Sequence, residues 1–404
     1  MRKLYTFFII TLLNITYATA QGRGSGLVDG DNYYRVRNFG SDRYVYVRDD
    51  FDDSDIFRQK ADFQAIELWK DASKTIYDPA SVILIHRYEN GHYNLQAQGT
   101  GVLELTGHAV QISNRLSDGT YKVFATEKNT TVYLAEERTT SGNQGKLGTN
   151  NEQEKFRKWI VDKIETNSAT NYFGIKPTIT LNGKYYHPFY AAFPFRTASA
   201  GMHVYYVSKV SGNTATLKEI EGNIPASTPV IIECASADPS NNRLELLTSK
   251  PAAIKGNKLV GVYFCNGERD WQSVNAYKRF DASTMRVLTP ANGQLILSNN
   301  ETSLLNSQVL EQIEVTDWDS EDEDEIEIAC IPANTCYLKA DAGTPDVLEI
   351  KFEAVGIEDI IANQTEKSVK GVYTLSGTQL RATNDVQGLP AGLYIVGGVK
   401  VAIK

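Results

Sequence analysis

The chain has 404 residues, of which 41 are Lys or Arg, 49 are Asp or Glu, and 42% are hydrophobic. This length allows two or three domains with cores of their own, and the hydrophobic fraction indicates a folded rather than a disordered chain. The formal net charge of −8, without a concentrated basic face, excludes the usual basis of nucleic-acid binding, so no nucleic acid is expected among the partners.

Residues 1–20 have the composition of a secretory signal peptide. Arg2 and Lys3 precede an apolar run that ends at Leu13, and Ala18-Thr19-Ala20 supplies the small residues of a cleavage site. No stretch reaches the roughly 18 apolar residues that a membrane helix needs. We therefore expect a mature chain without a membrane-spanning segment, secreted or on the outer cell surface. Its Gly-rich beginning, residues 21–32, is predicted to be flexible.

Residues 33–165 predict an antiparallel all-β domain, because short runs of β-branched and aromatic residues alternate with turns. Only residues 62–70, in which Phe63, Ile66 and Trp69 lie three apart, predict a helix. The expected strands are Tyr33–Arg37, Tyr44–Val47, Val82–Ile85, Tyr93–Ala97, Tyr121–Phe124 and Val132–Leu134.

A weak threefold repeat is visible in this region. Similar Tyr-containing openings begin at Asn32, Gly91 and Gly119, a pattern that favours a β-trefoil. With Trp69 and Trp159 at closing positions, the region resembles the ricin-B-type β-trefoil lectins, in which a Gln-x-Trp element closes each repeat. The resemblance implies a trefoil-like fold and a glycan-binding module. The chain has Trp but not Gln at these closing positions, which retains the core role of Trp and weakens the implication of sugar binding.

Residues 172–353 predict a second, β-sandwich-like domain. The segment 223–231 recurs as 330–338, and in both copies an Ile-Pro-Ala-(Ser/Asn)-Thr turn precedes an apolar strand. Proline fixes φ and removes a donor just before pairing begins. We interpret the copies as equivalent turns of a duplicated unit. The repeat resembles one seen in exported surface proteins of Gram-negative gut anaerobes, which implies an architecture rather than a chemistry.

An acidic run lies between the two copies. Residues 317–327 hold eight carboxylates in eleven positions. Removal of the signal peptide leaves 39 basic and 49 acidic residues, which gives a net charge of −10. The acidic run alone contributes −8 of this charge. It lacks the Gly of a calcium loop, which favours a solvated loop over a calcium site.

The last fifty residues predict a small β module, residues 354–404, with Gly-containing turns. It resembles the C-terminal sorting domain of the type IX (Por) secretion system. The resemblance implies recognition of the tail by the secretion machinery, followed by release or surface attachment. An ordinary terminal β-hairpin module is the alternative. The matching residues are Gly371, Tyr373, Leu375, Gly377, Gly388, Leu389, Gly392, Tyr394, Lys400 and Lys404.

No catalytic constellation is visible in the sequence. A Gly-x-Ser-x-Gly elbow and a phosphate-binding loop are both missing, and the five His residues lack metal-ligand spacing. We therefore predict no catalytic residue, no metal and no cofactor. Trp271, in a polar stretch, is the candidate exposed ring for ligand stacking. The cysteines either pair in one of three ways or are buried thiols, and they are Cys234, Cys265, Cys330 and Cys336.

These observations favour an exported, non-catalytic, adhesin-like binding protein. Its expected partners are a glycan or a surface protein, together with the secretion machinery. A lectin-like glycan-binding module and an exported hydrolase are the alternatives, the latter because two catalytic carboxylates can lie anywhere in a sequence.

Overall fold

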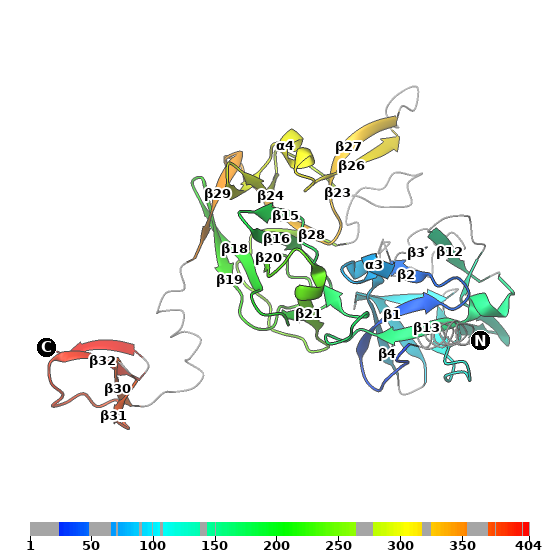
Figure 1. The fold of residues 1–404 in the computed structure, drawn as a ribbon, viewed down its shortest axis with the longest axis horizontal. Coiled ribbons are helices and arrows are strands. Elements are labelled where there is room, and N and C mark those ends of the chain that lie inside the picture. Colours follow the sequence, from blue (N-terminus) through cyan, green and yellow to red (C-terminus); the bar gives the residue numbers. More distant parts are fainter. Residues whose placement is uncertain are drawn as a thin grey trace, which may run out of the picture. The chain divides into compact units, whose positions relative to one another are not determined.

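The computed structural model is 47% strand and 7% helical, which confirms the predicted all-β class (Figure 1). It divides into two compact units, residues 1–351 and 352–404. None of the helices in the described ranges is long and apolar enough to cross a bilayer. The structure describes residues 24–47, 66–69, 72–88, 91–98, 100–105, 108–137, 144–149, 151–263, 278–316, 325–353, 371–375, 377–397 and 399–403.

Several predicted features lie outside the described residues. They are the signal peptide, Cys265, Trp271, residues 317–324 of the acidic run and Lys404.

The described residues of the first part of unit 1 form short strands and three helical turns. The strands are β1 (Asn32–Asn38), β2 (Tyr44–Val47), β3 (Ile66–Trp69), β4 (Ile83–Arg87), β5 (Tyr93–Ala97), β6 (Thr100–Leu105), β7 (His108–Ala109), β8 (Gln111–Ile112), β9 (Val123–Glu127), β10 (Thr130–Tyr133), β11 (Ala135–Glu136), β12 (Gln144–Gly148) and β13 (Trp159–Lys163). The helical turns are α3 (Ala72–Thr75), η1 (Pro79–Ser81) and η2 (Glu154–Arg157).

Six segments of this part form a closed ring. Strand β1 pairs antiparallel with both β4 and β13, and β4 pairs with β5. The Tyr93 amide then donates to Val110 O at 3.0 Å, β8 pairs with β9, and a bridge between Tyr121 and Trp159 returns to β13. Hairpins β6–β7 and β11–β12, and the pair β2–β3, are attached to this ring. Closure leaves few exposed edges, and the pairing pattern is that of a β-trefoil-like barrel.

Trp159 lies at the centre of the core of this module. Its side chain is fully buried, and its indole N–H donates to Leu134 O at 3.0 Å. Tyr34, Tyr46 and Ile83 belong to the same buried cluster. A tryptophan in such a position contributes a large apolar surface and needs one partner for its N–H, which it has here.

The helix predicted for residues 62–70 is wrong for the part that is described. Ile66–Trp69 is strand β3, and Trp69 is in register with Tyr44 of β2 on one side and Gln144 of β12 on the other. Backbone pairing on both sides outweighs the three-residue spacing of the apolar positions, because tertiary context overrides a short local pattern.

Residues 24–28, within the segment predicted to be flexible, are anchored beside β13. The Gly26 amide donates to Val161 O at 3.0 Å, and the Leu27 amide donates to the Tyr121 hydroxyl at 3.1 Å. Gly24 has φ +56°, and a Cβ there would lie 2.6 Å from Val161 O. A glycine is therefore required where this segment approaches the strand.

The second part of unit 1 is also built from strands. They are β14 (Phe173–Gly174), β15 (Ile179–Leu181), β16 (Lys184–Phe189), β17 (Phe195–Thr197), β18 (His203–Ser211), β19 (Thr214–Glu219), β20 (Val230–Cys234), β21 (Arg243–Leu246), β22 (Leu259–Val262), β23 (Lys278–Arg279), β24 (Met285–Ala291), β25 (Gln294–Ser298), β26 (Glu311–Thr316), β27 (Glu325–Ile331), β28 (Thr335–Lys339) and β29 (Val347–Phe352). The helical segments are η3 (Pro239–Asn241) and α4 (Glu301–Asn306).

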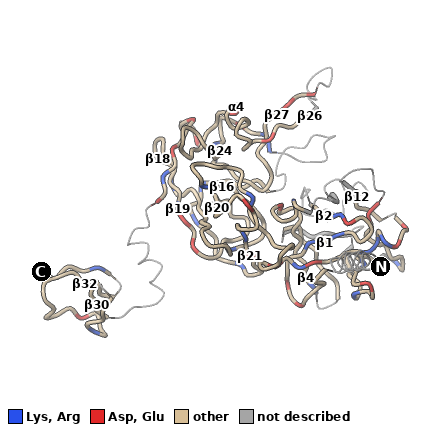
Figure 2. The backbone as a smooth tube through the Cα atoms, in the orientation of Figure 1, with Lys and Arg blue, Asp and Glu red and all other residues tan. Residues whose placement is uncertain are grey.

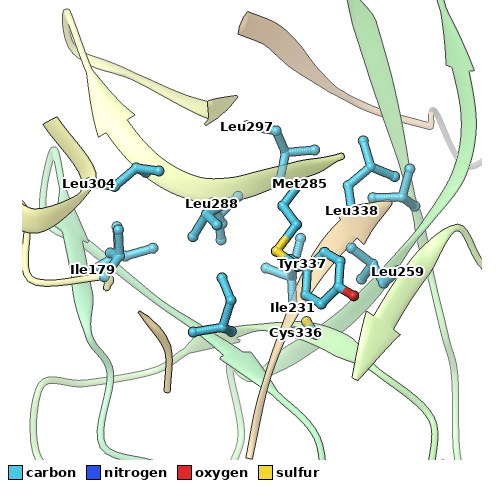
Figure 3. Close-up of a cluster of buried hydrophobic side chains, with 14 of the residues drawn as sticks. Ile179, Ile231, Leu259, Met285, Leu288, Leu297, Leu304, Cys336, Tyr337 and Leu338 are labelled. Atoms are coloured by element: carbon cyan, nitrogen blue, oxygen red, sulfur yellow. The ribbon is translucent and has the colours of Figure 1, made fainter. Parts of the chain in front are cut away.

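Ten of these strands form one curled sheet in the order β15-β16-β20-β18-β19-β29-β25-β24-β28-β22. The curl brings the β15–β16 turn to the β24–β25 turn, where the Asn182 side-chain amide donates to Gly293 O at 3.1 Å. Apolar side chains from both halves of the sheet fill the space inside, among them Ile231, Leu288 and Leu338 (Figure 3). Two layers of strands around a common core give the region its sandwich-like character.

The two Ile-Pro-Ala turns have the same backbone conformation. Ser227 and Asn334, in the fourth position of each turn, have φ values of +56° and +58°. Each turn leads into a strand that pairs with the first strand of a hairpin, β20 with β18 and β28 with β24. The repeated sequence therefore has a repeated backbone and a repeated pairing.

The two parts of unit 1 share a buried core. Tyr33 and Val82 from the first part belong to one cluster with Phe173 and Phe193 from the second. The rings of Tyr33 and Phe193 meet edge to face with centroids 5.9 Å apart. This shared core explains why contacts join residues 1–351 into one unit.

Unit 2 is a four-stranded sheet in the order β31-β30-β32-β33. Its strands are β30 (Val372–Thr374), β31 (Gln379–Arg381), β32 (Gly392–Val396) and β33 (Val399–Ile403). Gly377 and Gly388 of the predicted sorting motif have φ values of +88° and +77°, which favour glycine. Leu375 of the motif is 58% exposed, and the Tyr394 hydroxyl donates to Pro390 O at 3.0 Å.

Candidate binding site

The described residues do not form a metal-binding site. No group of three or more His, Cys, Asp or Glu side chains among them is arranged to hold a metal ion. Cys234 and Cys336 are buried free thiols, and Cys330 is buried as well. Burial raises the pKa of both Cys234 and Cys336 to about 12, so neither is a thiolate near neutral pH.

An exposed polar and aromatic cluster stands on hairpin β4–β5. His86 and Asn94 face each other across the two strands, and Tyr88 follows His86 by two residues and so shares its side of the sheet. Asp31 precedes β1, whose register with β4 places it opposite His86. We call Asp31, His86, Tyr88 and Asn94 the Tyr88 cluster.

Local sequence accounts for the hairpin that carries the cluster. The Tyr88 amide donates to His92 O at 2.8 Å, and the Gly91 amide returns to Tyr88 O at 2.9 Å. Gly91 has φ +82°, a conformation that a glycine adopts without steric cost. The Asn90-Gly91 turn signal therefore indicates where the chain reverses, although Asn90 itself lies outside the described residues.

Two contacts hold the Tyr88 ring in place, and a third holds His86. The His86 ring packs against it edge to face, with centroids 4.7 Å apart and an interplanar angle of 79°. The Asn94 side-chain amide donates to the Tyr88 hydroxyl at 3.1 Å. His86 Nδ1 in turn contacts an oxygen of the Asp31 carboxylate.

The ring is nevertheless open to solvent. Tyr88 is 46% exposed, and the side chains of His86 and Asp31 are 39% and 42% exposed. An aromatic ring that is both exposed and fixed loses little conformational entropy when a ligand covers it. The cluster thus presents a pre-organised aromatic surface bordered by a carboxylate and an imidazole.

Asn94 is the buried member of the Tyr88 cluster. Only 7% of Asn94 is exposed, and its Oδ1 has no hydrogen-bond partner among the described residues. A buried acceptor without a partner costs on the order of 1–3 kcal/mol. Natural proteins keep such costs mainly where a local arrangement serves function.

The cluster lies at the border of the interface between the two parts of unit 1. Leu84, His86 and Tyr88 point to the same side of the chain because side chains alternate along a strand. Leu84 packs against the hydrophobic core that contains Phe193 and is shared by the two parts of unit 1. Tyr88, four residues later, is exposed. Strand β4 therefore runs from the covered interface out to the exposed ring.

A second polar cluster stands on the neighbouring strands β16, β20, β18 and β19 of the ten-stranded sheet. Lys184 pairs with Glu233 at 2.8 Å, and His203 Nδ1 pairs with Glu219 at 2.7 Å. The rings of His203 and Tyr205 stack with centroids 6.3 Å apart. Burial and the nearby carboxylates of Glu233 and Glu219 raise the pKa of Tyr205. In this second cluster the Lys184 ammonium and the His203 imidazole each have a carboxylate partner, which is typical of a solvated surface network.

The distribution of charged residues does not indicate a second candidate binding surface in the described part of the chain. Lys and Arg are interspersed with Asp and Glu along the backbone of both parts of unit 1 (Figure 2). The other predicted site residue, Trp271, lies outside the described residues. The Tyr88 cluster is therefore the candidate site.

No protein-family model matches the chain, and a search of the curated proteins gives no match. The function is accordingly argued from the site itself.

The sequence patterns identified none of the four residues of the Tyr88 cluster, because the histidines were considered only for metal-ligand spacing. The signal available in the sequence was the position of His86 and Tyr88 two residues apart, directly after the apolar run that ends at Ile85. Recognition of the site also needed the register that sets Asn94 and Asp31 beside them.

Proposed function

We propose that this protein is an exported, surface-displayed, non-catalytic binding protein, adhesin-like in character, that contacts its ligand through the Tyr88 cluster. The observation that carries the proposal is the exposed Tyr88 ring, held by His86 and Asn94 beside the Asp31 carboxylate. Aromatic residues with a polar end are the side chains most often responsible for binding energy at interfaces. The signal-peptide pattern and the sorting-domain resemblance support export.

A lectin-like function is the second candidate. The specific observation in its favour is the combination of a stacking surface with a carboxylate acceptor in the same cluster. An exported hydrolase has less support. Glu219 and Glu233 both lie near Tyr205, but each already pairs with a cationic or imidazole partner. A screen for turnover of polysaccharides and peptides tests that alternative directly.

The binding proposal is tested with the purified mature chain, residues 21–404. Mucin, fibronectin, collagen and yeast mannan are immobilised, and binding is measured by surface plasmon resonance. We expect binding to at least one surface and a loss of tenfold or more in Tyr88→Ala. Phe39→Ala is the matched control, because Phe39 is 43% exposed on the same module but lies outside the cluster. Equal binding by Tyr88→Ala and Phe39→Ala would overturn the proposal.

The export proposal is tested in the native host. We expect deletion of residues 371–404 to abolish protease-accessible protein at the cell surface and in the medium. The full-length Phe39→Ala chain serves as the control for expression and handling. Unchanged surface exposure of the truncated chain would refute the sorting role of the tail.

A further inference from the structure

We propose that the Tyr88 cluster binds a positively charged side chain of a protein partner, and that it prefers the guanidinium of arginine to the ammonium of lysine. This inference rests on the proposed function, because it names the kind of partner that the same site takes. Three observations carry it: the negative charge in the cluster, the excess of hydrogen-bond acceptors over donors, and the exposed aromatic ring.

The charge beside the aromatic ring is negative. Among the described residues, Asp31 pairs with His86 and with no Lys or Arg. Asp29, also exposed, lies two residues earlier. Arg87 follows His86 directly but points to the other side of the hairpin, where its guanidinium carbon lies 6.0 Å from the centroid of the Tyr93 ring. The exposed carboxylate is therefore able to accept a cation from a partner.

The hydrogen-bonding groups of the cluster are mainly acceptors. An ionised carboxylate only accepts, so a neutral His86 donates from Nδ1 to Asp31, and its Nε2 is left as an acceptor. Asn94 Oδ1 is a further acceptor, without a partner among the described residues, and it belongs to the amide that donates to the Tyr88 hydroxyl. A guanidinium carries only N–H donors, whereas a sugar hydroxyl both donates and accepts. The cluster therefore matches a ligand that donates.

The exposed ring suits the same ligand. The quadrupole of an aromatic ring attracts a cation to the face of the ring, and the cation found there is more often arginine than lysine. Tyr88 is 46% exposed, and the His86 ring packs against it with centroids 4.7 Å apart. The same imidazole contacts the Asp31 carboxylate. The ring and the carboxylate are thus one imidazole apart, a separation that a planar guanidinium of similar size spans.

This arrangement favours arginine over lysine. A guanidinium is planar, so its face is able to lie on the Tyr88 ring while N–H groups at its edge donate to Asp31. An ammonium is a compact and strongly hydrated point charge, which pairs with a carboxylate but covers little aromatic surface. We therefore expect a peptide with Arg to bind at least threefold more tightly than the same peptide with Lys.

The experiment compares peptides that differ only in the charged side chain. Gly-Ser peptides that contain Arg are immobilised beside copies in which Arg is replaced by Lys or by citrulline, which keeps the planar shape but has no charge. Binding of the mature chain is measured by surface plasmon resonance. We expect the Arg peptide to bind at least tenfold more tightly than the citrulline peptide. An increase from about 0.05 M to about 0.5 M NaCl should reduce this difference, because salt screens exposed charges.

Three variants test the ring and the carboxylate separately. Tyr88→Ala and Asp31→Asn are each expected to weaken binding of the Arg peptide at least fivefold. Asp31→Asn should also remove most of the preference for Arg over citrulline. Tyr88→Phe keeps the face of the ring, and we expect it to bind within threefold of the parent chain. All variants are checked for an unchanged melting temperature, so that a loss of binding is not a loss of folding.

Two matched controls separate the site from general effects. Glu152→Gln removes one negative charge from an exposed position of the same module, so it tests whether binding follows net charge alone. Phe39→Ala removes a similarly exposed ring outside the cluster. Both are expected to bind the Arg peptide within twofold of the parent chain. Equal losses in Asp31→Asn and Glu152→Gln would refute the inference.

The outcomes distinguish this inference from the proposed function. If Tyr88→Ala abolishes binding to mucin or another immobilised surface while the Arg and citrulline peptides bind alike, the cation inference fails and the proposed function stands. The same conclusion follows if a neutral methyl glycoside binds at the cluster and the Arg peptide does not. Equal binding of the Arg and Lys peptides would refute the preference for arginine. If Tyr88→Ala alters no binding at all, both proposals fail.

Discussion

Gln98 and Asn334 exchange two side-chain amide hydrogen bonds across the interface between the two parts of unit 1. Asn334 Nδ2 donates to Gln98 Oε1 at 3.2 Å, and Gln98 Nε2 donates to Asn334 Oδ1 at 3.4 Å. Both residues are buried and both have positive φ, +53° and +58°. Gln98 Oε1 also accepts from the Ala192 amide at 3.2 Å, so the pair joins the turn after strand β5 to the second Ile-Pro-Ala turn.

We expect this amide pair to be energetically coupled. Gln98→Ala leaves the Ala192 amide and the Asn334 side chain without their partner in a buried site, which costs about 2–4 kcal/mol of the free energy of unfolding. Asn334→Ala should cost a similar amount, and the double variant about 0.5–3 kcal/mol less than the sum. Urea unfolding measures all three, with Gln96→Ala on the same strand as the control. Strict additivity would contradict the coupling.

Arg35 should be the most sensitive charged position of unit 1. It is 1% exposed, its Nε donates to Ser81 Oγ at 3.1 Å, and its guanidinium also donates to Asn171 Oδ1 at 2.6 Å and to Thr75 O. Burial lowers its pKa to about 10, so it remains charged at neutral pH. Arg35→Met is expected to cost more than about 3 kcal/mol, because three acceptors lose their donor.

The lysine variant tests the fork geometry of this site. Arg35→Lys keeps the charge but has one nitrogen for three acceptors in different directions, so it should rescue the stability only in part. Arg37→Met, at a less buried position of the same strand, is the control and should cost less than Arg35→Met. Equal losses at the two positions in urea unfolding would contradict the prediction.

His187 is expected to make the protein sensitive to acid. Its half-buried ring contacts Thr178 Oγ1 at 3.3 Å and packs near Phe189, and burial lowers its pKa to about 4. The unfolded chain binds the proton near pH 6.5, so stability is complete above that pH and decreases as the pH falls toward 4. With allowance for partial exposure, the loss is about 2–3 kcal/mol.

Urea unfolding between pH 7 and pH 4 measures this loss. His187→Gln should flatten the profile, since no group at this position then titrates. His187→Asn, which also removes the titrating ring, should flatten the profile in the same way. A profile that is identical in the parent chain and in His187→Gln would show that the acid sensitivity has another origin.

The thiols of Cys234 and Cys336 should be unreactive in the folded protein. Both are buried, and their pKa of about 12 leaves almost no thiolate at pH 8. In a chain with Cys265→Ser and Cys330→Ser, Ellman's reagent should modify neither thiol in buffer and both in concentrated urea. Rapid labelling of the folded chain would contradict the buried positions.

Ser227 offers a stabilising substitution. It is exposed and has φ +56°, whereas its counterpart Asn334 occupies the same conformation with a residue type that tolerates it. Ser227→Asn should raise the free energy of unfolding, because Asn adopts a positive φ at lower cost than Ser. The reverse change, Asn334→Ser, should destabilise the chain, because it also removes the bonds to Gln98. Thermal melts of both variants test the comparison, and a lower melting temperature for Ser227→Asn would refute it.

Local sequence patterns were sufficient to predict strands and their boundaries where a strand is short and bounded by turn residues. The predicted runs Tyr44–Val47 and Tyr93–Ala97 are β2 and β5 without a change of boundary. They failed at Ile66–Trp69, where the deciding partners, Tyr44 and Gln144, are distant in sequence. An amphipathic spacing over a few residues cannot reveal such partners.

The candidate site was less predictable than the fold for the same reason. Tyr88 looks like any strand-end tyrosine in the sequence, and its significance depends on the ring contact with His86 and the hydrogen bond from Asn94. The residue favoured by the sequence, Trp271, was chosen for its polar neighbours, which indicate exposure but do not show whether the ring is held in place.

The pairing of β1 with β13 has a consequence for the order in which the chain folds. Tyr34 and Lys163 are register partners, so the ring of the first module is not closed until nearly all of that module is available. Contacts between residues so distant in sequence must overcome a large loop-closure entropy, which slows folding. Because synthesis begins at the N-terminus, the first module cannot close its ring until β13 has been made.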